Sequence, residues 1–337
     1  MTKVFITGIA GFIGSSLAHS LSNTCEVVGI DNMSYGHESN LTRDGKRLTG
    51  FHIADARDRN LQDLVRGSDI VFHFAGIAPL PNNQLNPQEC VSNNIESTAN
   101  MLELSRKVGV KQFILSSTSA VYENSKFDFL PETDDGAPDL MYAVSKQCAE
   151  RVTRSFNSCY GIPTTILRFF NVYGPHQDFL RQSPPLMGYI VREILRGKSP
   201  VLHSDGKQER DYVHIDDVLS MCHAVMANES AYGRTLNVCS GETHSVNEIL
   251  QICEEVIGLG SSGAKFRESD RLWDAYPDLF SGNYPLSRER IKKETEKFSR
   301  GDTTLSKDII GWKASVPFCE GVSKTVKVMI DLLRDNT

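Results

Sequence analysis

The sequence has no long apolar run, no excess of positive charge and no closely spaced cysteine pair. No window of about 18 uncharged apolar residues occurs, so we expect neither a membrane span nor an export signal. The 36 lysines and arginines are scattered among 42 acidic residues, and the formal net charge is −6, which predicts no nucleic-acid partner. The eight cysteines are widely spaced and therefore predict reduced, packed thiols without disulfides or a metal site. We expect a cytoplasmic protein.

The sequence does contain an alternation of short β-branched runs with longer segments of helical pattern. Six runs carry it: VFIT, VVGI, FHIA, DIVFHFA, FILSS and TTILRFF. Strands separated by helix-length segments are typical of a parallel sheet with crossover helices. The rhythm holds to about Asn171, after which proline and glycine become frequent. The pattern predicts an α/β fold with a second, smaller domain.

A glycine-rich turn follows the first run. Gly8, Gly11 and Gly14 open a helix, a spacing that permits a tight turn and a close approach of the backbone to a pyrophosphate. About twenty residues later Asp31 ends the second run, where a carboxylate can accept hydrogen bonds from an adenosine ribose. No arginine follows until Arg43, so NAD is favoured over NADP. The alternative to NAD binding is that the glycines only form a turn and that Asp31 only ends a strand, with no ligand at either place.

A hydroxyl cluster and a tyrosine-lysine pair form the second motif. The cluster is SSTS at residues 116–119, and the pair is Tyr142 and Lys146. The segment 141–159 is predicted to be a helix, so the pair lies one turn apart on one face. A tyrosine base working at neutral pH needs about 4 kcal/mol of preferential stabilisation of its phenolate. A neighbouring ammonium could supply part of that energy, although such a pair also arises by chance.

Together these motifs resemble the extended short-chain dehydrogenase/reductase superfamily, and more closely its NAD-dependent nucleotide-sugar epimerase/dehydratase family. Further similarities lie in RFFNVYGP at residues 168–175, RDYVH at 210–214, and DTTLSK at 302–307 followed by Gly311-Trp312. The resemblance covers essentially the whole chain. It implies a Rossmann-type doubly wound parallel sheet with a smaller, discontinuous C-terminal α/β substrate domain. Residues 1–173 and about 212–239 would form the NAD-binding domain, and residues 174–211 and 240–337 the nucleotide-sugar domain.

The resemblance also implies roles for individual residues. Tyr142 would be the catalytic acid/base, Lys146 would hold the cofactor ribose and lower the pKa of the tyrosine, and Thr118 would complete the triad. The implied NAD-binding residues are Gly8, Gly11, Phe12, Ile13, Gly14, Asp31, Asn32, Asp55, Ala56, Ala75, Gly76, Asn94, Ser116, Tyr142 and Lys146. The implied substrate-binding residues are Thr118, Ser119, Asn171, Leu186, Val201, His203 and Arg210. For Asn171 a strand-end turn is the alternative, and for Arg210 a surface salt bridge with Asp211 or Asp216.

Several positions depart from the family pattern. The family's dehydratases carry an acidic residue just behind the catalytic threonine, whereas this chain has Ser119 and Ala120. Glu123 replaces a common glycine and is expected to be an exposed loop carboxylate, with a displaced catalytic acid as the alternative. Leu140 stands where the family has a small polar residue. The missing acid favours a 4-epimerase acting on a UDP-hexose or UDP-N-acetylhexosamine.

The resemblance and the pattern lead to further expectations about the activity, the oligomeric state and the late part of the chain. A 4,6-dehydratase or another oxidoreductase of the family is the alternative enzyme, and a non-catalytic NAD-binding sensor is a further one. Helices over about 87–107 and 141–159 are the ones that this family pairs across a dimer, so we expect a homodimer. The segment 261–301 is expected to be a long loop region with a short helix of its own. The loop at residues 77–88 and the region around Trp273 are expected to choose the sugar.

Overall fold

The computed structural model describes residues 1–179, 181 and 184–334, and a seven-stranded parallel sheet lies at its centre. The strand order is β12-β8-β7-β6-β1-β2-β5. The strands are β1 (Lys3–Thr7), β2 (Glu26–Asp31), β5 (Phe51–Ile53), β6 (Ile70–His73), β7 (Gln112–Thr118), β8 (Thr164–Phe169) and β12 (Arg234–Val238). Every pairing within it is parallel. The predicted Rossmann-type sheet is confirmed, and each of the six predicted runs forms one of its strands.

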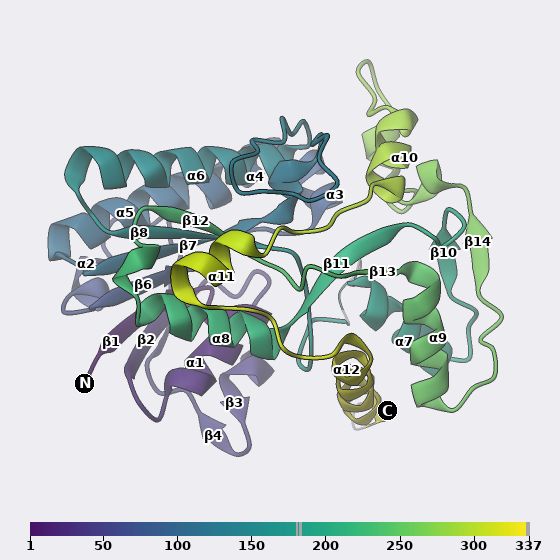
Figure 1. Cartoon of the computed structure of the whole chain (residues 1–337), viewed down its shortest axis with the longest axis horizontal. Coiled ribbons are helices and arrows are strands. Elements are labelled where there is room, and N and C mark those ends of the chain that lie inside the picture. Colours follow the sequence, from purple (N-terminus) through teal and green to yellow (C-terminus); the bar gives the residue numbers. More distant parts are fainter. Residues whose placement is uncertain (180, 182–183, 335–337) are drawn as a thin grey trace.

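Helices cover both faces of this sheet (Figure 1). On one side lie α2 (Gln62–Val65), α5 (Ser97–Val108) and α6 (Met141–Tyr160), and on the other α1 (Phe12–Leu21) and α8 (Ile215–Met226). Successive strand residues point to opposite faces, so the neighbours Phe5 and Ile6 enter two different hydrophobic cores. The sheet is therefore buried on both faces, and a site can form only where its strands end.

The smaller part of the chain contains three helices packed on one another (Figure 1, right). They are α7 (Leu186–Leu195), α9 (Val246–Ile257) and α12 (Phe318–Arg334). Short strands accompany them: β9 (Asn171–Tyr173), β11 (Glu209–His214) and β13 (Thr243–Ser245) in one sheet, and β10 (Val201–His203) with β14 (Lys265–Arg267) in another. The chain then returns to the large sheet through α11 (Thr304–Ile310). Trp312, just after this helix, packs in the hydrophobic core on one face of that sheet. The proposed division into two domains stays a prediction.

Two further segments matter for the site. The first contains α3 (Leu80–Leu85), α4 (Pro87–Val91) and a π-helical turn (Ser92–Glu96) that leads directly into α5. The predicted helix over 87–107 is thus present, with a π turn that the pattern did not indicate. In the second, the predicted short helix of segment 261–301 is α10 (Arg288–Glu296). Short 3-10 turns precede it at Ser269–Arg271 and Pro277–Phe280.

The remaining elements are small. A hairpin joins β3 (Thr42–Arg43) to β4 (Lys46–Arg47), and 3-10 turns lie at Glu38–Leu41, Ser119–Tyr122 and Glu229–Ala231. Among the helices within the described residues, none combines the length and apolarity needed to cross a bilayer.

Candidate functional site

The turn between β1 and α1 has room only for glycine at two positions. Gly8 has φ +72°, and a Cβ there would lie 2.9 Å from the Ala75 nitrogen. A Cβ on Gly14 would lie 2.1 Å from the Gly8 carbonyl oxygen. The backbone can therefore turn tightly and present the amino end of α1, which carries the positive end of the helix dipole. This is the geometry that the glycine spacing predicts.

Asp31 ends β2 beside this turn, and its carboxylate is held by two backbone N–H groups. The Ala10 nitrogen donates to Oδ2 at 3.0 Å and the Met33 nitrogen to Oδ1 at 2.9 Å. Burial raises the pKa of Asp31, and these two hydrogen bonds oppose the rise. A carboxylate has about four acceptor positions, so Asp31 can still accept hydrogen bonds from a ligand.

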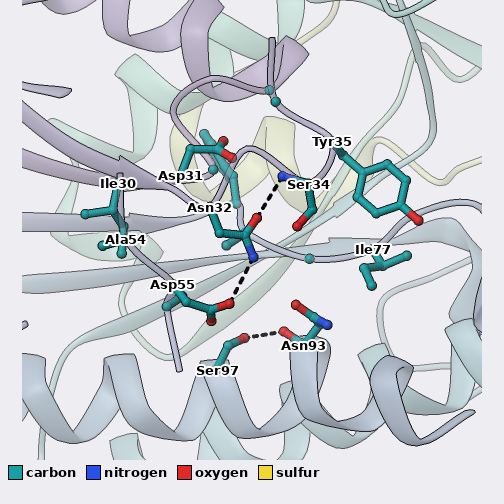
Figure 2. Close-up of a pocket in the computed structure, with 17 residues that line it drawn as sticks. Ile30, Asp31, Asn32, Ser34, Tyr35, Ala54, Asp55, Ile77, Asn93 and Ser97 are labelled. Carbon is teal, nitrogen blue, oxygen red and sulfur yellow. Dashed lines mark hydrogen bonds between the residues drawn. The ribbon is translucent and has the colours of Figure 1, made fainter. Parts of the chain in front are cut away.

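Asp55 and Asp31 line one cavity at the carboxyl ends of β1, β2, β5 and β6, and Asn32 lies between them (Figure 2). Asp55 Oδ2 accepts a hydrogen bond from Asn32 Nδ2 at 2.9 Å. Arg57 donates to both oxygens, at 2.9 and 2.7 Å, and holds the pKa of Asp55 well below its usual range. The carboxylate is therefore fixed and ionised at the rim of the cavity.

The structure brings most of the predicted cofactor residues together. Those that line the cavity are Gly8, Gly11, Asp31, Asn32, Asp55, Ala56, Ala75 and Gly76. The other seven are not among the lining residues: Phe12, Ile13, Gly14, Asn94, Ser116, Tyr142 and Lys146. Sequence reasoning missed Tyr35, Ile77, Asn93 and Ser97, which also line it. Asn93 and Ser97 are four residues apart where the π turn meets α5, so helical spacing was the available signal.

Asn94 supports the cavity wall from behind. Its Oδ1 accepts a hydrogen bond from the Ile77 nitrogen at 3.0 Å, and its Nδ2 donates to Ser145 Oγ at 2.9 Å. The π turn places this buried amide between the end of β6 and helix α6. π turns often mark functional positions because they redirect a side chain. Asn94 thus connects the dinucleotide cavity to the helix that carries Tyr142.

Thr118 ends β7 where this strand packs against α6, the helix that carries Tyr142 and Lys146. Burial raises the pKa of Tyr142 to about 12, and a hydrogen bond with the Thr118 side chain opposes this rise. Burial lowers the pKa of Lys146 to about 8, partly opposed by the negative charge of Glu150. Burial and the nearby Lys146 charge lower the pKa of His73 to about 3, so this histidine is neutral and its Nδ1 lies 2.8 Å from Thr7 Oγ1. The structure thus places the Thr118 and Tyr142 side chains near each other.

A second cavity, of about 650 Å³, opens beyond the end of β8. Five of the predicted substrate residues line it: Asn171, Leu186, Val201, His203 and Arg210. Ser119 lines a different cleft, and Thr118 is in neither set. A volume of this size is in the usual range for small-molecule sites.

Backbone carbonyls hold the polar residues of this cavity. Arg210 Nη2 donates to the carbonyls of Glu294 and Thr295 at 2.9 and 3.0 Å, so it does not form the surface salt bridge considered as an alternative. Asn171 Nδ2 donates to the Asp211 carbonyl at 2.8 Å. Both side chains are therefore fixed, and both retain N–H groups that can face a ligand.

Sequence reasoning missed several residues that line the same cavity. They are the cations Arg192, Arg267 and Arg271 and the aromatic residues Tyr189, Tyr212, Trp273 and Tyr276. Four of the seven lie in the segment 261–301, which contains the Trp273 region that was expected to choose the sugar. The combination of guanidinium groups and aromatic rings suits an anion attached to a planar base.

The expectation that Glu123 is an exposed loop carboxylate is wrong. Only 1% of its side chain is exposed, and it forms an ion pair with Arg290 of α10. Its Oε2 accepts the backbone N–H groups of Asp139 and Leu140 at 2.8 and 2.9 Å. Both oxygens are therefore engaged, which argues against the displaced catalytic acid. Sequence spacing carried no signal for this partner, because Arg290 lies far along the chain.

Comparisons with known proteins agree with this geometry. The family described as "NAD dependent epimerase/dehydratase family" matches residues 4–239. An uncharacterized UDP-glucose epimerase of Bacillus subtilis is 31% identical over 270 residues, covering 76% of this chain and 82% of that protein. The structure of UDP-glucose 4-epimerase from Thermotoga maritima with UDP-glucose has a TM-score of 0.85 at 29% identity, over 98% of this chain and 100% of that one. The UDP-N-acetylglucosamine 4-epimerase of Methanobrevibacter ruminantium, in complex with UDP-N-acetylmuramic acid, has a TM-score of 0.85 at 28% identity, over 98% and 99%.

Proposed function

Because the chain belongs to the NAD dependent epimerase/dehydratase family, we propose that it is an NAD-dependent nucleotide-sugar 4-epimerase acting on a UDP-hexose or UDP-N-acetylhexosamine. The observation that supports the proposal is the placement of Thr118 at the end of β7 against α6, the helix on which Tyr142 and Lys146 lie one turn apart. In the sheet, β7 lies between the strands of the dinucleotide cavity and β8, which leads to the substrate cavity. The reacting groups thus lie between two sites that suit a cofactor and a nucleotide.

The residues of the first cavity fit NAD. The glycine turn leaves space that a Cβ would fill, and Asp31 retains acceptor capacity for two ribose hydroxyls. Arginine is absent from the lining among the described residues. Arg43, the first arginine after Asp31, donates instead to Ser15 and Ser16 at 3.2 and 2.9 Å. A ribose 2′-phosphate would therefore meet a carboxylate without a compensating cation, which supports NAD over NADP.

The proposed reaction moves one proton and one hydride. When bound, NAD supplies the acceptor that takes the hydride from sugar C4 and returns it to the opposite face. Tyr142 takes the proton of the C4 hydroxyl and gives it back after the sugar has turned over. Thr118 donates a hydrogen bond to the phenolate, and the Lys146 ammonium favours its negative charge. Asn171 and Arg210 hold the diphosphate, so the sugar can rotate while the nucleotide stays bound.

A 4,6-dehydratase is the alternative within the same family. That reaction removes a proton from C5 and a hydroxyl from C6, so it needs a further acid/base group beside the sugar. Ser119 and Ala120 follow Thr118 and supply no carboxylate. Glu123 is the next acid along the chain, and Arg290 and two backbone N–H groups hold it. A non-catalytic NAD-binding sensor would not need the Thr118, Tyr142 and Lys146 set.

Turnover in deuterated water tests the proposal. With a UDP-hexose or UDP-N-acetylhexosamine, we expect the C4 epimer with no deuterium at C5 or C6, and no requirement for added nicotinamide, because the hydride returns to the sugar. NMR of the product reads both positions. Tyr142→Phe is the control and should lower turnover by at least about 10²-fold, the scale of general acid/base catalysis. Deuterium at C5, or a 6-deoxy-4-keto product, would establish the dehydratase instead.

We further propose that the protein works as a homodimer in the cytoplasm. Support for the dimer comes from the family resemblance and from the position of α5 and α6 on one outer face of the molecule (Figure 1). The cytoplasmic location stays a prediction from composition.

A further inference from the structure

Helix α6 begins without a cap of its own. Leu140 is the N-cap residue and forms no side-chain cap hydrogen bond. The first backbone N–H groups of a helix need partners from outside it. Here side chains from other segments supply them: Glu123 Oε2 accepts from Leu140 at 2.9 Å, and Gln84 Oε1 accepts from Met141 at 3.2 Å. Tyr142 is the next residue, so these acceptors fix the backbone beside the reacting hydroxyl.

Glu123 is also close in sequence to the other half of the hydroxyl pair. It directly follows the 3-10 turn Ser119–Tyr122, which Thr118 caps through a hydrogen bond from the Ala120 nitrogen at 3.1 Å. The carboxylate therefore joins the segment that carries Thr118 to the residues just before Tyr142. Its two hydrogen bonds, to Asp139 and Leu140, set how closely those segments approach.

Arg290 of α10 holds this carboxylate in place. It pairs with Glu123 Oε1, and its Nε donates to Asp139 Oδ1 at 2.6 Å. The exposed fraction of the Arg290 side chain is 12%. Leu140 is in addition packed in an apolar cluster with residues of the same late segment, namely Trp273, Tyr276, Leu279 and Ile291. Polar and apolar contacts from residues 273–291 thus converge on the first turn of α6.

The carboxyl end of α10 reaches the substrate cavity. The carbonyls of Glu294 and Thr295 accept hydrogen bonds from Arg210, and all three residues line that cavity. One helix of nine residues therefore contacts Arg210 at one end and, through Arg290, Glu123 at the other.

We propose that Glu123 and Arg290 are positioning residues that set the contact between Thr118 and Tyr142. The inference rests on the proposed role of Tyr142. It assigns no chemical step to Glu123, whose oxygens are both engaged.

The kinetics of Glu123→Gln test this proposal. The variant keeps an acceptor oxygen but loses the charge that pairs with Arg290. We expect kcat for a UDP-hexose or UDP-N-acetylhexosamine to fall by about 10-fold or more, with KM changed by less than about 2-fold, because small misplacements of reacting groups reduce the chemical step. The acid limb of the pH profile of kcat should move to higher pH, since a weaker Thr118 contact favours the phenolate less. Arg290→Met should behave alike, and Arg290→Lys should restore part of the activity.

Asp217→Asn is the matched control for a purely structural role. Asp217 is also a buried carboxylate that accepts backbone N–H groups, from Ser315 at 2.8 Å and Val316 at 3.1 Å, but it lies on α8. Asp217→Asn should lower the melting temperature of the protein without moving the pH profile of kcat. If Glu123→Gln changes only the melting temperature, as this control does, the positioning role is wrong. If the wild-type protein converts no nucleotide sugar, the proposed function fails instead, so the two failures are distinguishable.

Discussion

Tyr142 needs strong stabilisation of its phenolate by its surroundings if it is to act as a base at neutral pH. With a pKa of about 12, forming its phenolate at pH 7 would cost about 7 kcal/mol, at about 1.4 kcal/mol for each pH unit. Burial is the main cause of this high pKa, and the Thr118 hydrogen bond is the contact within the chain that opposes it. The positive charges of Lys146 and of the oxidised nicotinamide act in the same direction as Thr118. Tyr142 can therefore act as a base near neutral pH only when Thr118, Lys146 and the oxidised nicotinamide are all in place.

Thr118→Val should move the pH dependence of turnover upward. A hydrogen bond to the charged form lowers the pKa of an acid, so its loss raises the pKa of Tyr142 and reduces the phenolate fraction at any given pH. We expect the acid limb of the kcat profile to shift by about one pH unit to higher pH and kcat at pH 7 to fall by about 10-fold or more. Steady-state kinetics across pH measure both. An unchanged acid limb would separate Thr118 from the titration of Tyr142.

At the scale of residues, the roles that could be predicted from the sequence are those that depend on positions close together in the chain. Gly8 and Gly14 depend on backbone space, and Tyr142 with Lys146 depends on one helical turn. Glu123 was misjudged because its burial comes from Arg290, which lies 167 residues away along the chain. A single carboxylate in a polar stretch gives no sign of such a partner.

At the scale of elements, a buried ion pair fastens α6 to the sheet. Glu150 of α6 and Arg168 of β8 have no exposed side-chain surface, and two hydrogen bonds of 2.9 and 2.8 Å join them. Ser117 of β7 donates to the same carboxylate at 2.5 Å. Glu150 is one turn beyond Lys146, so this pair holds the helix at the level of the site.

Arg168→Met should destabilise the fold by about 3–5 kcal/mol, because it leaves the Glu150 charge buried without its main partner. Arg154→Met is the matched control: Arg154 pairs with the same carboxylate, but 40% of its side chain is exposed, so its loss should cost no more than about 1 kcal/mol. Urea unfolding measures both free energies. Equal costs for the two variants would contradict the assigned importance of burial.

Most elements of the large sheet could be predicted, whereas their junctions could not. Strands such as β1 and β6 contain continuous apolar runs, because parallel strands are buried on both faces. The π turn at Ser92–Glu96 follows from tertiary contacts of Asn94 with Ile77 and Ser145, which no local pattern contains. The same holds for the start of α6, whose cap comes from Glu123 and Gln84.

For the whole molecule, we predict a dimer with twice the chain mass of 37.5 kDa. The helices expected at the interface expose apolar residues at two places, Val91 of α4 by 43% and Tyr160 at the end of α6 by 60%. Light scattering at micromolar concentration measures the mass. Val91→Glu should give the monomer, because a charge in an apolar interface is costly, and Tyr284→Glu should not, since Tyr284 is 98% exposed and lies outside these helices. A monomeric wild-type protein would overturn the prediction.

The two cavities draw on different stretches of the chain. Among the described residues, those that line the dinucleotide cavity lie between Gly8 and Ser97, and Pro81 is the one residue of this stretch that lines the substrate cavity instead. Mutations that change which sugar or base is bound can therefore accumulate after residue 170 without changing the residues that line the dinucleotide cavity. A gene with this layout can diverge toward new nucleotide sugars one mutation at a time, and each intermediate would still bind NAD.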